Sequence, residues 1–268
     1  MSNQNGSNSS APAELSRVLT LRSLVFYGIA FIIPLAFFTT YGIVTNTTHG
    51  HVSMTYVVAT LCMVFTAYSY CRMSKAFPSS GSVYAYATET FNPYIGFIAG
   101  WTIVLGYMFL PMLNYLASAI FMQAALPSIP LWVWVVLFTV IVTGANLLGI
   151  KVADIFNNVV VIIQLIFLVI LLIMTIRYIT GHDLAINMSA FYNSEEFANM
   201  GGVKGIASGA AIVCLAYLGF DGIAALGEEA IEPKKNIPKA LMICCIGVGA
   251  MYVIFTYLLQ AAWPTAWN

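Results

Sequence analysis

Asp221 is the residue best suited, by type and position, to bind a charged molecule. It is the one strong acid deep inside an apolar stretch from residue 205 to 230, within the sequence Leu218-Gly219-Phe220-Asp221-Gly222. A carboxylate at the centre of a membrane costs at least about 2.5–3.5 kcal/mol, so an acid retained there predicts a binding site. The two glycines predict an unwound backbone around it. The alternative is an aspartate that packs against a polar side chain of a neighbouring helix.

Pro34 predicts a second interruption, near the middle of the first apolar stretch. A proline inside a helix removes a hydrogen-bond donor and clashes with the preceding turn. One interpretation is a simple kink. The other is a discontinuous helix whose freed backbone groups bind a substrate.

The composition identifies the surroundings of these residues as a membrane. Only 20 of the 268 residues are Asp, Glu, Lys or Arg, which is 7%, whereas soluble domains average roughly 25%. This excludes a soluble enzyme, a nucleic-acid-binding protein and a disordered protein. The net charge of zero provides no steering toward nucleic acid. The five cysteines match no metal-site spacing, no His-Glu-x-x-His motif occurs, and no cofactor is predicted.

Charge-free runs predict an all-α membrane protein. Residues 1–21 form a polar, disordered cytoplasmic tail, and residues 22–268 form the membrane region. A span needs about 20 apolar residues. Seven spans are predicted, at residues 22–46, 53–74, 94–126, 131–150, 154–178, 205–230 and 238–262.

The distribution of basic residues predicts the orientation in the cytoplasmic membrane. With a cytoplasmic N-terminus, eight bases face the cytoplasm and only Arg177 and Lys204 face outward. The eight are Arg17, Arg22, Arg72, Lys75, Lys151, Lys234, Lys235 and Lys239. Residues 181–204 then form an external loop.

Several separated motifs resemble the amino acid–polyamine–organocation transporters. After Asp221 the chain reads Glu228-Glu229-Ala230-Ile231-Glu232-Pro233-Lys234-Lys235-Asn236-Ile237-Pro238-Lys239-Ala240, which is similar to the family's sixth-helix signature. Residues 77–86 and 92–101 resemble the connection to the third helix and that helix's start. Residues 109–114 and 131–136 are most similar to the putrescine importers within the family.

The resemblance implies a five-plus-five inverted-repeat fold, of the LeuT-like type, in which the first and sixth helices are discontinuous. An amino acid or polyamine would bind between their unwound segments in the lipid bilayer. The resemblance places Ile33, Pro34, Leu35 and Thr39 on one side and Gly219, Phe220, Asp221 and Gly222 on the other, with Tyr107 on the third helix. Phe220 would be an aromatic gate, or would pack into the neighbouring helix.

Further residues qualify this expectation. Glu228 and Glu229 would pair with Lys234, Lys235 or Arg72 in a structural or gating role. Gln164 occupies a position that is a lysine in some proton-coupled members, which leaves the coupling ion open between H⁺ and Na⁺. Diamine importers carry further acids where this chain has Thr39 and Gly106, which favours a substrate with one amine.

The length is the last departure from the family. The fold needs ten core helices, and this chain is expected to supply the first seven. We therefore expect the N-terminal part of a transporter: either a second chain supplies the remaining helices, or the chain is a fragment without independent transport.

Overall fold

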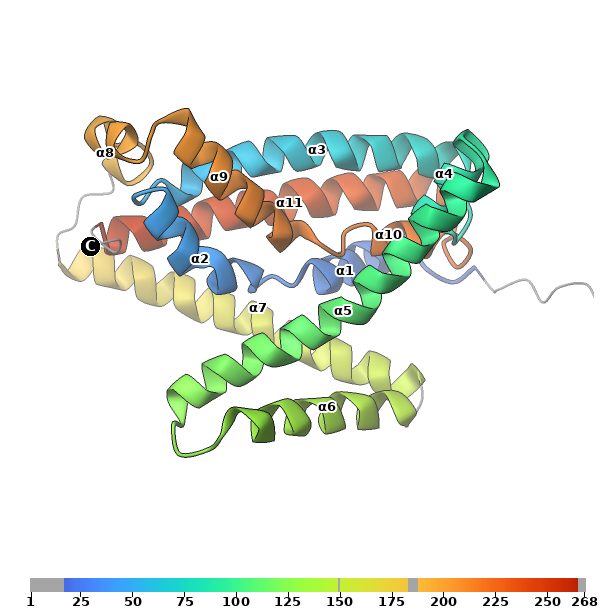
Figure 1. Ribbon diagram of the computed structural model, residues 1–268, viewed down its shortest axis with the longest axis horizontal. Coiled ribbons are helices and arrows are strands. Elements are labelled where there is room, and N and C mark those ends of the chain that lie inside the picture. The colour runs from blue at the N-terminus through green and yellow to red at the C-terminus, as the bar shows by residue number, and fades with distance from the viewer. Residues whose placement is uncertain (1–16, 149, 183–187, 265–268) are drawn as a thin grey trace, which may run out of the picture.

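The computed structural model describes residues 17–148, 150–182 and 188–264, and these residues fold almost entirely as helices (Figure 1). Their one β pairing is an isolated bridge between Leu19 and Ala230. The elements are α1 (Leu21–Ile32), α2 (Ala36–Thr47), α3 (Val52–Ala76), α4 (Ser82–Thr90), α5 (Pro93–Ala125), α6 (Leu131–Leu147), α7 (Ile150–Gly181), η1 (Met188–Ala190), α8 (Ser194–Asn199), α9 (Val203–Val213), η2 (Cys214–Tyr217), α10 (Gly222–Ala225) and α11 (Pro233–Ala262).

Five of the described helical segments are long and apolar enough to cross a membrane, and the bent pair α1–α2 adds a sixth. The remaining predicted span, at residues 131–150, corresponds to α6, which is apolar but has 17 residues and is therefore about 25 Å long. The all-α prediction is confirmed for the described residues. The last predicted span begins too late, because α11 starts at Pro233 rather than at residue 238. Proline is well accommodated in the first turn of a helix.

Helix starts follow from local sequence. The Thr20 hydroxyl accepts a hydrogen bond from Ser23 N at the start of α1. At the start of α5, Asn92 Oδ1 accepts from Ile95 N at 2.9 Å, and Pro93 occupies the first turn. Both are side-chain N-caps that satisfy backbone donors left free at a helix terminus. The second cap fixes the beginning of α5, the helix that carries Tyr107.

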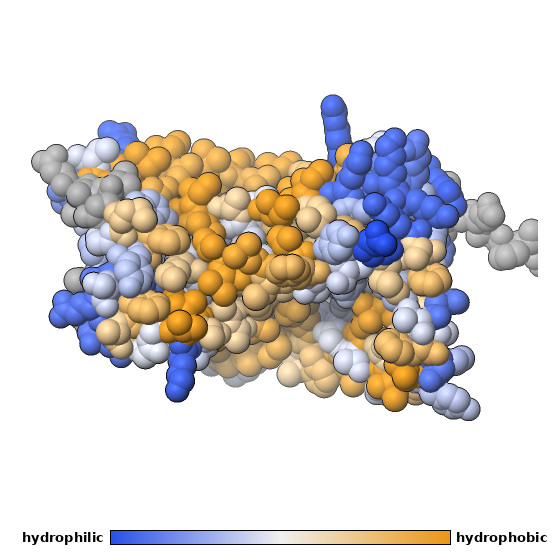
Figure 2. Space-filling model, turned by 90° about the horizontal axis from the view of Figure 1, so that it is seen from above, coloured by the Kyte–Doolittle hydropathy of each residue, from blue (hydrophilic) through white to orange (hydrophobic). Residues whose placement is uncertain are grey.

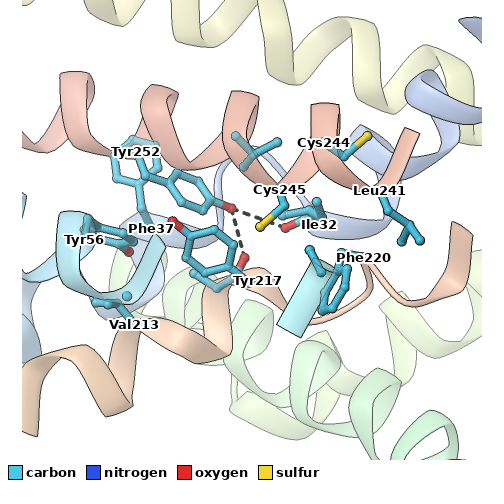
Figure 3. Packing of buried hydrophobic residues seen from close by; sticks show 14 of the residues in the cluster. Ile32, Phe37, Tyr56, Val213, Tyr217, Phe220, Leu241, Cys244, Cys245 and Tyr252 are labelled. Atoms are coloured by element: carbon cyan, nitrogen blue, oxygen red, sulfur yellow. Dashed lines mark hydrogen bonds between the residues drawn. The ribbon is translucent and has the colours of Figure 1, made fainter. Parts of the chain in front are cut away.

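The core lies where α3 and α11 run side by side with the α1–α2 pair and α9 (Figure 1). Its largest fully buried side chains include Tyr56, Tyr217, Tyr252 and Phe37. Figure 3 shows these aromatic rings gathered beside Ile32 and Phe220. The core therefore surrounds the residues on either side of both predicted interruptions.

One face of the molecule is apolar in the middle and hydrophilic at both ends (Figure 2). Figure 2 shows hydrophobic side chains across the middle of one face and hydrophilic ones at its two ends. The α5 and α6 helices expose most of their apolar side chains, including Trp101, Met108 and Trp132. This is the pattern of a helix bundle whose middle faces lipid or further helices.

The lysines of two helices meet at one of these ends. Lys75 on α3 and Lys234, Lys235 and Lys239 on α11 line one groove of about 490 Å³. Four bases of the predicted cytoplasmic group are thus neighbours in space. Which side of a membrane this end faces remains a prediction.

Candidate functional site

The first interruption separates α1 from α2 at residues 33–35. Ile33 has a positive φ of 55°, and the two helices meet at an angle of 45°. The Ala36 N–H donates to Ile33 O at 2.8 Å, and the Phe38 N–H donates to Leu35 O at 3.1 Å. These are turn bonds rather than helical ones. The interruption predicted from Pro34 is confirmed, and it is a break rather than a slight kink.

The second interruption follows η2. After this 3₁₀ turn the backbone is extended at Leu218, and Gly219 has a φ of +102° before the single-turn helix α10 begins at Gly222. L-residues rarely adopt that φ, whereas glycine does so readily. The unwound backbone predicted around Asp221 is therefore confirmed.

The two interruptions lie against each other. A Cβ on Gly219 would overlap the Phe31 carbonyl oxygen, and a Cβ on Gly222 would lie 2.9 Å from Cδ2 of the Phe31 ring. Two segments almost 190 positions apart in the sequence are thus in contact, and the approach is possible because the second segment has glycines at the points of contact. The structure thus places the end of α1, two residues before Ile33, in contact with Gly219 and Gly222.

Asp221 carries the charge at this contact. Its side chain is partly buried, and the Tyr107 hydroxyl on α5 donates a hydrogen bond to Asp221 Oδ2 at 3.2 Å. Tyr107 is half-exposed and also lines a groove of about 460 Å³ between α4 and α5. A carboxylate with one fixed donor still has lone pairs available for a cationic group. The predicted residues Asp221 and Tyr107 are therefore direct neighbours.

Phe220 packs into the helix bundle (Figure 3). It is 5% exposed and packs edge-on against Tyr70 of α3, with ring centroids 5.2 Å apart. This geometry matches the packing interpretation of Phe220, while its role as a gate remains a prediction. Tyr70 is close enough to interact electrostatically with both Asp221 and Tyr107. Sequence reasoning missed Tyr70, because nothing in the sequence distinguishes it from the other 14 of the 15 tyrosines.

Two predicted residues lie apart from this contact. Thr39 is exposed on α2, and its hydroxyl donates to Ala36 O of its own helix at 2.7 Å. Gln164 lies on α7, where its Oε1 is shielded from solvent and has no hydrogen-bond donor among the described residues. The substrate-binding role of Thr39 and the ion-coupling role of Gln164 remain predictions.

The acidic residues after α10 make different contacts from those predicted. Glu228 Oε1 accepts from the Ser80 hydroxyl at 2.7 Å and from the Ser80 N–H at 3.3 Å. Neither Glu228 nor Glu229 forms an ion pair with Lys234, Lys235 or Arg72 in the described parts of the chain, where Lys235 instead pairs with Glu232 at 3.0 Å. The predicted pairing is wrong, because the chain turns after Ala225 and places Glu228 over the loop between α3 and α4.

A main-chain bridge joins the N-terminal arm to the segment between α10 and α11. The N–H groups of Val18 and Leu19 both donate to Glu229 O at 2.9 Å, and the Ile231 N–H donates to Leu19 O at 2.9 Å. We call these three bonds the arm bridge. The backbone of Glu229, rather than its carboxylate, is thus what holds the arm.

Two carboxylates outside the apolar band, those of Glu228 and Glu196, have lowered pKa values. The Ser80 hydroxyl, followed by the Ser80 N–H, lowers the pKa of Glu228, because both donors stabilise the ionised form. At the other end of the bundle, a hydrogen bond from the His49 ring at 2.9 Å lowers the pKa of Glu196 on α8. In the described residues no group of three or more His, Cys, Asp or Glu side chains is placed to hold a metal ion.

Comparison with known protein families shows which family this chain belongs to. A profile of the amino acid permeases matches residues 23–267, almost the whole chain. The chain belongs to the amino acid permease family. The family predicted from the sequence motifs is confirmed, and the members of this family are transporters rather than enzymes.

Individual relatives of this permease carry different cargoes. It is 35% identical to the low-affinity putrescine importer PlaP of Escherichia coli over 94% of this chain and 55% of that protein. It is 27% identical to the branched-chain amino acid permease BcaP of Bacillus subtilis over 96% of this chain and 57% of that protein. It is 26% identical to the lysine-specific permease LysP of Lactococcus lactis over 97% of this chain and 53% of that protein. The chain thus spans about half the length of these relatives.

Proposed function

We propose that this permease chain forms the substrate-binding part of a secondary active transporter for an amino acid or a polyamine. The observation that carries the proposal is the position of Asp221, a partly buried carboxylate at the contact between two interrupted helices. Transport would proceed by alternating access across the cytoplasmic membrane, with the N-terminus in the cytoplasm.

The proposed fold is the first seven helices of a five-plus-five inverted repeat. In it, α1–α2 is the first helix and α9–α10 is the sixth, and each is interrupted near its middle. Supporting this assignment, the interruptions are in contact, and family membership implies the same architecture. Such interrupted helices present free backbone groups to a substrate at the membrane midplane.

The proposed cargo has an ammonium group that pairs with Asp221. A carboxylate on the cargo would lie at the start of α2, where Leu35 provides no side-chain cap and the helix dipole favours an anion. Ile33, Pro34, Leu35 and Gly219 would contact the cargo mainly through their backbone. One acid suits one amine, so an amino acid or a monoamine fits this site better than a diamine.

The test is uptake of radiolabelled amino acids and putrescine by proteoliposomes, with wild type compared with Asp221→Asn. The substitution keeps the size of the side chain and removes its charge. We expect uptake at low substrate concentration to fall about ten- to hundredfold, because a charge-assisted hydrogen bond is lost.

Glu89→Gln is the matched control, because it removes an exposed acid of α4. We expect the control to transport like wild type. Equal uptake by Asp221→Asn and wild type would rule out Asp221 as the amine site. Competition by putrescine, lysine and leucine on the same preparation would then rank the cargo classes.

A second proposal is that the chain transports only together with the helices that its relatives carry beyond the matched half. The exposed apolar faces of α5 and α6 and the coverage of about half of each relative favour it. Those helices could belong to a longer form of this protein or to a second chain. Saturable uptake by the 268-residue chain alone would contradict it.

A further inference from the structure

The Tyr252 hydroxyl lies between the ends of the two interrupted helices. Its single proton is shared among three acceptors: Ala216 O at 3.0 Å, Ile33 O at 3.2 Å and Ile32 O at 3.4 Å. Figure 3 shows Tyr252 reaching from α11 to both segments. One hydroxyl on a third helix thus serves carbonyl oxygens on either side of the contact.

Two of these carbonyls, those of Ile32 and Ala216, need a donor because the interruptions redirect the N–H groups that would otherwise reach them. In a continuous helix the Ala36 N–H would donate to Ile32 O, but here it donates to Ile33 O. In the second segment the Phe220 N–H would serve Ala216 O, but here it donates to Tyr217 O at 3.5 Å. A buried carbonyl without a partner costs about 1–3 kcal/mol. Tyr252 therefore supplies a donor where both helices lose theirs.

The tyrosine ring is held in place by its neighbours. Tyr252 is fully buried, and its ring packs against Tyr56 at 5.3 Å, Tyr217 at 5.6 Å and Phe37 at 5.7 Å between centroids. Phe37 belongs to α2 and Tyr217 to η2, so the ring contacts the same two helices as the hydroxyl. A buried ring has few rotamers to choose from, which fixes the position of the oxygen.

We propose that Tyr252 is a positioning residue that fixes the two unwound segments relative to each other, so that both face one bound substrate. The inference rests on the proposed function, because Ile33 and Gly219–Asp221 are the segments proposed to bind the cargo. It assigns to α11 a role in substrate affinity without contact with the substrate.

The first experiment is hydrogen exchange on the purified full chain in detergent, wild type against Tyr252→Phe. The variant keeps the ring and removes the donor. We expect amides in residues 31–37 and 216–222 to exchange about tenfold faster, both segments together, because one lost hydrogen bond loosens both.

Tyr56→Phe is the matched control. Its hydroxyl lies 3.3 Å from Thr40 Oγ1, and its ring is part of the same aromatic cluster. We expect exchange in both segments to stay at the wild-type rate. A p-aminophenylalanine at position 252 restores a donor on the same ring, and we expect it to restore slow exchange. If Tyr252→Phe does not accumulate as folded protein, slow exchange in this third variant decides the question.

The second readout is uptake kinetics. A group that positions the binding segments affects affinity, so we expect Tyr252→Phe to raise KM about tenfold with little change in kcat. Faster exchange in only one segment, or equal acceleration in Tyr56→Phe, would contradict the idea that the Tyr252 hydroxyl holds both segments. Acceleration in both segments with an unchanged KM would overturn the positioning role. If wild type takes up neither amino acids nor putrescine, the proposed function fails. The hydrogen-exchange comparison still tests whether the Tyr252 hydroxyl holds both segments.

Discussion

The two interruptions break their helices by different physical means. Between α1 and α2 the chain uses Pro34 and an isoleucine at a φ of 55°, and the segment has no ionisable side chain. Between η2 and α10 it uses glycine at a φ of +102° and carries Asp221. A β-branched residue at positive φ costs on the order of 1–3 kcal/mol, whereas glycine adopts it without that strain.

The two interruptions therefore provide different groups to the proposed site. The first interruption offers backbone groups and stores strain, which the surrounding core offsets. The second offers a charge and depends on close approach of two backbones. We therefore expect the first to tolerate substitution of its characteristic residue and the second not to.

The largest effect is expected for Gly219→Ala. The added Cβ would overlap the Phe31 carbonyl oxygen and would also force a side chain into an unfavourable φ. Since backbone atoms cannot rotate away, we expect loss of folded protein or at least a hundredfold lower uptake, on the order of 3 kcal/mol or more. Size-exclusion profiles and uptake measure both outcomes.

Gly42→Ala provides the control for this change. Gly42 lies in α2 a few residues after the first interruption, and a Cβ there meets nothing within 4 Å. Alanine is a better helix former than glycine by about 1 kcal/mol, so we expect equal or higher stability. If Gly219→Ala behaves like Gly42→Ala, close packing of the two interruptions is not required.

A smaller effect is expected for Pro34→Ala. The positive φ of Ile33 and the turn bond from Ala36 do not depend on the pyrrolidine ring. The main loss is the restriction that proline places on the unfolded chain, about 0.4–1 kcal/mol. We expect a Tm lower by a few degrees in a thermal-shift assay, with uptake retained. A loss of transport as large as that of Gly219→Ala would remove the distinction between the two interruptions.

The smallest effect is expected for Ser80→Ala, at the far end of the second interruption. The pKa of Glu228 is lowered by Ser80, so this contact stabilises the fold above the carboxyl's unfolded pKa of about 4.3. The contribution disappears as the pH falls through the lower folded pKa, because the carboxylate becomes protonated. We expect the variant to melt slightly earlier than wild type at pH 7 and equally at pH 3.

Ser69→Ala is the comparison for the pH dependence. Its hydroxyl donates to Phe65 O within α3, where no carboxylate takes part. Any change in Tm should therefore be the same at both pH values. A difference between wild type and Ser80→Ala that does not vary with pH would show that Glu228 is not its source.

Much of the fold and part of the site could be predicted from the sequence, for identifiable reasons. Charge-free runs locate membrane helices because a buried charge is costly. Pro34 marks an interruption because proline removes a backbone donor, and Gly219 marks one because glycine readily adopts a positive φ. The resemblance to the family proposed Tyr107 on the third helix, and the structure places its hydroxyl beside Asp221. These signals act within one segment of the chain.

Contacts between segments were harder to predict. The Tyr70 ring packs against Phe220, about 150 positions away, and the Tyr252 hydroxyl donates to Ala216 O, 36 positions away. No local pattern distinguishes these two residues from other tyrosines. The ion pairs expected for Glu228 and Glu229 failed for the same reason. Nearness in sequence favoured Lys234 and Lys235, whereas the turn after Ala225 directs Glu228 toward Ser80.

The arm bridge has a consequence for how this protein can change over generations. Its three hydrogen bonds join peptide groups of Val18, Leu19, Glu229 and Ile231, so no side chain is needed to form them. Almost any residue can replace Val18 or Leu19 and still make the bond, and proline alone removes the donor. The attachment of the arm can therefore persist while its sequence drifts, which hides it from comparisons that rely on residue identity.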